Sequence, residues 1–143
     1  MTIKPHVARA LRDARARLRD VAAADHAAAA ERREAAAAEL ASEHDRLTAF
    51  VDDAPARLAR ASSVNDLDRV AMLVGAHHGE IASAATRHAE TVALVELMTG
   101  ALRERTRQLK TAERIVDNVH SARDAREARG EQRGTDDLAA RRR

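Results

Sequence analysis

The sequence predicts an all-α protein, a long two-helix antiparallel coiled-coil hairpin that occupies residues 1–143 as a single domain. Three observations predict this fold class. Most of the 45% hydrophobic content is alanine, and Phe50 is the sole aromatic residue, so a compact globular core would be thin. Long stretches lack Gly and Pro. Apolar residues also recur at helical spacing on both sides of Pro55.

The first helix is predicted over residues 6–51. This stretch contains neither Gly nor Pro, and Pro5 suits a first helical turn. Its apolar residues recur every 11 residues, which is typical of a nearly straight helix. The face expected to pack on the second helix contains Val7, Leu11, Ala14, Leu18, Ala22, Ala29, Ala36, Leu40, Leu47 and Val51.

A connection is predicted over residues 52–65, because Pro55 disfavours a helix interior and Ser62 and Ser63 are good N-cap residues. The second helix is predicted over residues 66–129, with apolar residues at alternating spacings of three and four. The expected packing face contains Leu67, Val70, Val74, His77, Ile81, Ala84, His88, Thr91, Val95, Met98, Leu102, Arg105, Leu109, Ala112, Val116 and Val119.

The apolar pattern stops after Val119, and Gly130 and Gly134 predict a basic C-terminal tail over residues 130–143. A short connection makes the two helices antiparallel, so the longer second helix extends past the start of the first. The end that carries both termini then brings the arginines of residues 9–19 near those of the C-terminus.

Charge and composition exclude several functions. The net charge is +2, and there is no cysteine, which excludes disulfides and cysteine-based metal sites. No apolar stretch approaches the roughly 20 residues that span a bilayer. The N-terminus lacks the apolar region of a signal peptide. We expect a soluble cytoplasmic protein without stable membrane insertion.

The residues indicate no enzyme. The serines lack the glycine context of a nucleophile elbow, and no glycine-rich phosphate loop occurs. His77 and His88 lie on one helix face but roughly 16 Å apart, too far to share a metal ion. The sequence therefore predicts no catalytic, cofactor or metal site.

Binding to other proteins is the function that remains. Balanced charge and missing aromatics disfavour a basic helical nucleic-acid binder, and the alanine-rich face of the first helix disfavours a membrane-surface helix. A generic coiled-coil scaffold or chaperone stays open, as does a chain that is partly disordered until bound. Phe50, Met72 and Leu73 are candidate contact residues near the connection, although they could also cap the hairpin core.

Two segments carry a family resemblance. The stretch LRERTRQLKTAER at residues 102–114, followed by EQxxxDDxAxR at residues 131–141, resembles the flagellar export protein FliJ. It is also similar to the SctO/YscO stalk proteins of injectisomes. The tail pattern favours the flagellar branch, and the chain length and longer second helix fit the same family.

The resemblance implies a non-enzymatic central stalk of a type III export apparatus, cytoplasmic and peripheral to the inner membrane. Its open end would insert into the hexameric export ATPase, and a face nearer the turn would contact the cytoplasmic domain of the export gate. Export chaperones are further partners in the family. The implied gate contacts are Phe50, Leu73, His77, Glu80 and Ala84. The expected ATPase contacts, from their position at the open end, are Arg9, Arg12, Arg15, Arg133 and Arg141.

Overall fold

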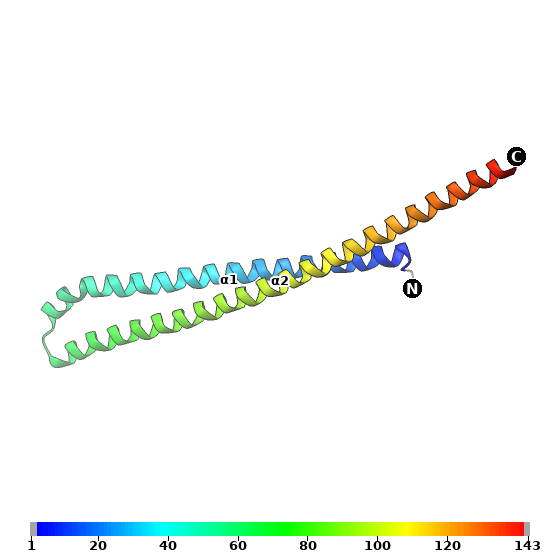
Figure 1. Cartoon of the computed structure of the whole chain (residues 1–143). Helices are drawn as coiled ribbons and strands as arrows, with labels where there is room; N and C mark the ends of the chain where they lie inside the picture. Colours follow the sequence, from blue (N-terminus) through cyan, green and yellow to red (C-terminus); the bar gives the residue numbers. More distant parts are fainter. Residues whose placement is uncertain (1–2, 142–143) are drawn as a thin grey trace. The chain divides into compact units, whose positions relative to one another are not determined.

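Two long helices make up the protein (Figure 1). The computed structural model describes residues 3–141, and describes side chains for residues 3–136. Helix α1 comprises Pro5–Arg60 and helix α2 comprises Val64–Arg141, joined by residues 61–63. The predicted all-α helical hairpin is confirmed.

The chain divides into two compact units, and each helix contributes to both. We call Met1–Ala23 with Ala101–Arg143 the terminal unit, and Ala24–Gly100 the turn unit. Within each unit the α1 segment packs antiparallel to the α2 segment, because contact partners fall in α2 numbering as they rise in α1. The pairs are Arg9–His120 and Arg15–Gln108 in the terminal unit, and His26–Thr99 and Glu39–Arg87 in the turn unit.

The predicted packing face of α2 is confirmed. Every predicted position except Leu67 is buried or half-buried, and Ala84, Ala112 and Val116 are the most buried. Small residues at such positions let two helices approach closely. The helix interface therefore buries mostly small side chains, and among the described residues no large side chain is fully buried.

The predicted packing face of α1 is only partly right. In the turn unit Ala29, Ala36, Leu40 and Leu47 face α2 as expected, whereas Val51 is exposed. In the terminal unit only Ala22 of the predicted residues is half-buried, and the others are exposed. The exposed residues are Val7, Leu11, Ala14 and Leu18, and the residues that are buried or half-buried in their place are Ala8, Arg12, Arg15, Ala16 and Arg19.

The physical reason lies in the repeat length. Two helices that pack over many turns share one period, and α2 follows a seven-residue repeat. From Ala8 to Ala54, most α1 positions that are not exposed follow alternating spacings of four and three. Residues spaced by an 11-residue repeat drift around the helix relative to a seven-residue repeat. The predicted packing face therefore matches the observed one only over a few turns.

Helix α1 ends later than predicted, at Arg60 instead of residue 51. Pro55 lacks the N–H that would bond to Val51, but the residues after it are strong helix formers. Asp53 also accepts a hydrogen bond from Arg57 Nε at 2.6 Å, one turn further on and across the proline. The connection is therefore residues 61–63, not 52–65.

Helix α2 begins at a capping box formed by Ser63 and Asp66. Ser63 Oγ accepts from Asp66 N at 3.3 Å, and Asp66 Oδ2 accepts from Ser63 N at 3.0 Å. Asp66 Oδ2 also accepts from Ser62 N at 3.0 Å. The hydrogen bonds that Ser62 and Ser63 donate to the Asp66 carboxylate, that from the Ser62 backbone first, lower the pKa of Asp66 below its usual 3.8.

Helix α2 also ends later than predicted, because the expected tail over residues 130–143 is helical up to Arg141. Gly130 and Gly134 each cost about 1 kcal/mol against alanine, which the surrounding Ala, Glu, Gln and Arg residues tolerate. Every residue from 121 to 136 is exposed, and within this part of α2 Ala122, Arg123 and Arg126 line a groove with Pro5 at the start of α1. We call residues 121–141 the overhang.

Candidate functional site

A stripe of large apolar side chains faces outward from α1 in the terminal unit. Their exposed fractions lie between 37% and 58%, and their spacing places them on one side of the helix. Such a contiguous exposed apolar face is typical of a binding surface. We call it the outward stripe; it contains Val7, Leu11, Leu18 and Val21 of α1, and Ile3, which precedes the helix.

The outward stripe begins at a groove of about 610 Å³ between the start of α1 and α2. Its lining is largely apolar, with two arginines from the overhang region. The lining residues include Ile3, Pro5, Ile115, Val119, Ala122, Arg123 and Arg126. Arg123 Nε donates a hydrogen bond to Glu127 Oε1 at 2.6 Å, and this bond raises the pKa of the Arg123 guanidinium. The groove suits an apolar side chain of a partner that carries carboxylates nearby.

The two units carry opposite charge. The terminal unit contains 18 basic and 10 acidic residues, whereas the turn unit contains 7 basic and 13 acidic residues. The overall charge of +2 therefore conceals about +8 in one unit and −6 in the other. A field of this kind attracts partners of opposite sign to each unit.

Polar side chains occupy the helix interface of the terminal unit. Gln108 Oε1 accepts hydrogen bonds from Arg15 at 2.7 Å and from Arg105 at 3.1 Å. Gln108 Nε2 donates to Glu104 at 3.0 Å. Arg19 Nε is buried without a hydrogen-bond partner. Arginine and glutamine side chains thus occupy this layer of the interface in place of large apolar residues.

The predicted ATPase contacts lie in different environments. Arg9 is exposed and donates to His120 Nε2 at 3.4 Å, while Arg133 is exposed on the overhang. Arg12 and Arg15 are half-buried, with Arg12 paired to Asp13 and Arg15 bonded to Gln108. The side chain of Arg141 lies outside the described residues. Of the described four, Arg9 and Arg133 are the ones most open to a partner.

The predicted gate contacts all lie in the turn unit. Leu73 and Glu80 are exposed, and Phe50 and His77 are half-buried with their ring centroids 5.3 Å apart. Ala84 is fully buried against α1, so its place in a surface stripe is wrong. The stripe fails there because the same helix face forms the interface with α1. Met72, by contrast, is 74% exposed and does not cap the core.

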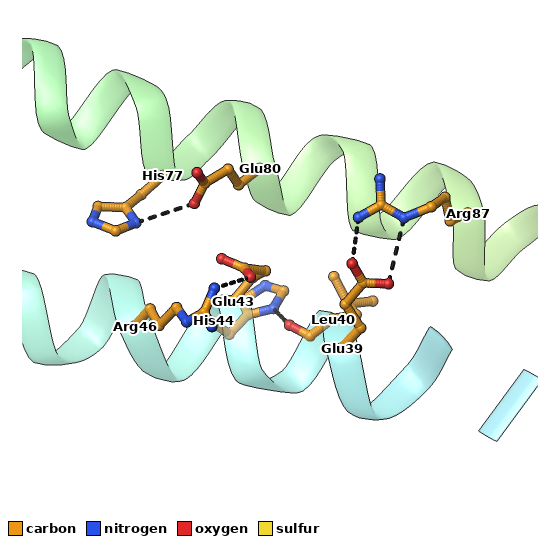
Figure 2. A network of polar contacts seen from close by, with 8 residues as sticks. All are labelled: Glu39, Leu40, Glu43, His44, Arg46, His77, Glu80 and Arg87. Atoms are coloured by element: carbon orange, nitrogen blue, oxygen red, sulfur yellow. Dashed lines mark hydrogen bonds and ion pairs between the residues drawn. The ribbon is translucent and has the colours of Figure 1, made fainter. Parts of the chain in front are cut away.

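A polar cluster spans the two helices of the turn unit (Figure 2). Glu43 of α1 and His77 and Glu80 of α2 have ligand atoms within 4.8 Å of one another. The prediction that His77 and His88 lie too far apart to share a metal ion rested on their spacing along one helix. The missed signal was Glu43, a carboxylate on the seven-residue register of Leu40 and Leu47 and therefore on the face toward α2.

Neither described helix holds a segment long and apolar enough to cross a bilayer. Comparison with models of known protein families, with curated proteins and with solved structures finds no match to this chain. The resemblance of residues 102–141 to export stalk proteins therefore stays a prediction.

Proposed function

We propose that the protein is a non-enzymatic stalk of a type III export apparatus, cytoplasmic and peripheral to the inner membrane. In this proposal the terminal unit enters the ring of the hexameric export ATPase. The turn unit contacts the cytoplasmic domain of the export gate, and export chaperones bind as further partners. The motif at residues 102–141 and the two-helix fold support this assignment.

The outward stripe is the observation that carries the proposal. In the terminal unit α1 places Ala8, Ala16 and three arginines against α2 and leaves its larger apolar side chains exposed. If Val7, Leu11 and Leu18 faced α2, the folded state of the isolated chain would be stabilised by roughly 25 cal/mol for each Å² of apolar area buried. Their outward position favours a role in binding a partner.

The charge of the terminal unit indicates the chemistry of that partner. A surface with an apolar stripe and a net charge of about +8 fits a partner face that is apolar at its centre and acidic at its edges. An asymmetric helix pair in the pore of a ring would make unequal contacts with the ring subunits. Such contacts could promote ring assembly and bias which subunit hydrolyses ATP.

The test measures ATP hydrolysis by the purified export ATPase from the same organism, with and without the full chain. We expect faster hydrolysis and more hexamer with the wild-type chain, and loss of both with a Val7→Asp, Leu18→Asp double variant. A matched control is Met72→Asp with Leu97→Asp, because both residues are exposed in the turn unit. This control should keep the stimulation.

The result has clear contrary outcomes. If the wild-type chain changes neither the rate of ATP hydrolysis nor the oligomeric state of the ATPase, the stalk assignment is contradicted. Equal losses in the stripe variant and its control would contradict the role of the terminal unit. DNA binding with a steep salt dependence would favour a basic nucleic-acid binder instead.

A further inference from the structure

The polar cluster of Glu43, His77 and Glu80 contains buried polar atoms without partners. Glu43 is 8% exposed, and only its Oε1 is engaged, by Arg46 at 2.5 Å. Glu43 Oε2 and His77 Nδ1 are both buried without a hydrogen bond. Glu80 Oε2 lies 3.6 Å from His77 Nδ1, which is too long for a hydrogen bond.

Burying such groups unpaired is costly. An unsatisfied buried donor or acceptor costs about 1–3 kcal/mol, and more when the group is charged. A leucine at position 43 would continue the apolar register of Leu40 and Leu47 without that cost. The free Glu43 oxygen points into the same space as the His77 and Glu80 ligand atoms, which calls for a ligand that satisfies all three (Figure 2).

We propose that Glu43, His77 and Glu80 bind a divalent transition-metal cation of the Zn²⁺ class and so link α1 to α2. One imidazole nitrogen and two carboxylate oxygens form a donor set that binds such metals. His77 and Glu80 are three residues apart, so their side chains share one face of α2. Glu43 supplies the third ligand from across the interface.

The geometry is near that of a bound site. Tetrahedral Zn²⁺ at its usual bond lengths places ligand atoms roughly 3.3 Å apart, against the present limit of 4.8 Å. The exposed Glu80 side chain can close much of this difference by rotation. A groove of about 440 Å³ lined by Glu43 and Glu80 leaves room for a water molecule as fourth ligand.

Neighbouring groups support the ligands. The Phe50 ring packs on His77 at 5.3 Å between centroids and holds the imidazole toward the cluster. Arg46 and Arg87 also line the groove, but each is paired to a glutamate, Glu43 Oε1 and Glu39 respectively. The net charge of about −6 on the turn unit favours a cation there.

The test uses the full chain without a polyhistidine tag, freed of metal and titrated with Zn²⁺ by calorimetry. We expect one Zn²⁺ per chain. At free Zn²⁺ about 100 times the Kd, the Tm should rise by roughly 5–10 °C. Glu43→Gln, His77→Gln and Glu80→Gln should each weaken Zn²⁺ binding by more than roughly tenfold, which is the cost of losing a group that only hydrogen-bonds to a ligand.

His78→Gln is the matched control, because this exposed histidine adjoins His77 on another face of α2 and should leave binding unchanged. Glu80→Gln guards against misfolding, since Glu80 is exposed and its loss leaves the interface intact. A wild-type chain that takes up no Zn²⁺ would overturn the proposal. Binding that survives His77→Gln, or a Tm that responds to pH but not to Zn²⁺, would overturn it equally.

Discussion

The terminal unit and the turn unit pack the same two helices by different means. In the turn unit Leu40, Leu47 and Phe50 of α1 face α2, whereas in the terminal unit alanines and arginines do so and the outward stripe is exposed. The charges differ as well, at about −6 and +8. The turn unit thus places three large apolar residues of α1 in the helix interface, whereas the terminal unit leaves Val7, Leu11, Leu18 and Val21 of α1 exposed.

The largest expected effect concerns the tightest packing in the turn unit. Ala84→Leu should destabilise the protein by roughly 1–3 kcal/mol, because Ala84 is fully buried and a larger side chain would push α1 away. Ala85→Leu is the control, since Ala85 is exposed and should change stability by less than about 0.5 kcal/mol. Denaturant unfolding followed by far-ultraviolet circular dichroism measures both. Equal stability of the two variants would contradict the packing described.

The same leucine-to-alanine substitution, made once in each unit, tests the comparison between the units. Leu47→Ala should cost roughly 1–2 kcal/mol, less than for a fully buried leucine because Leu47 is half-buried. Leu18→Ala should stay within about 0.5 kcal/mol, because Leu18 faces outward. Thermal unfolding of the purified variants separates them. A Leu18→Ala cost as large as that of Leu47→Ala would mean that the outward stripe is packed within the chain.

The capping box gives an intermediate effect in the turn unit. Ser63→Ala should cost about 1 kcal/mol, because Ser63 Oγ accepts the Asp66 N–H at the start of α2. Ser42→Ala is a control, since Ser42 is exposed in the middle of α1 and caps no helix. Unfolding midpoints of the two variants should differ, and identical midpoints would argue against the cap.

The same cap predicts a pH dependence. The lowered pKa of Asp66 means that its contribution to stability is complete above pH 3.8 and is lost as the pH falls below that value toward the folded-state pKa. Asp66→Asn should remove this part of the acid dependence. Thermal unfolding of both proteins between neutral pH and pH 3 checks the prediction. Parallel curves for the two proteins would contradict it.

The smallest expected effects come from glycines. An added Cβ at Gly79 or Gly130 would meet no atom within 4 Å, so alanine should favour the helix by roughly 0.5–1 kcal/mol at either position. Gly79→Ala should raise the unfolding midpoint, because Gly79 lies where α1 and α2 pair. Gly130→Ala should raise helix content in the overhang with little change in the midpoint. Circular dichroism melts record both quantities, and a reversed pattern would mean that the overhang is packed.

Much of the fold was predictable because it depends on local patterns. The seven-residue repeat of α2 ran unbroken over many turns, so its packing face was right at almost every position. The ends of the helices were less predictable. Pro55 and Gly130 lower helix propensity but do not forbid a helix when strong helix formers and a pair such as Asp53–Arg57 surround them.

The sequence by itself determined that this chain is two long helices, with a connection somewhere within residues 52–65 and a polar end to the second helix. Only the tertiary structure decided which side of α1 faces α2, because two interlocking helices must share one period and the large apolar residues in the first turns of α1 lie off that period. It also decided which residues from distant positions meet. Glu43 and His77 are unremarkable along the chain, and they become a candidate metal site only because the antiparallel pairing places them at the same level of the interface.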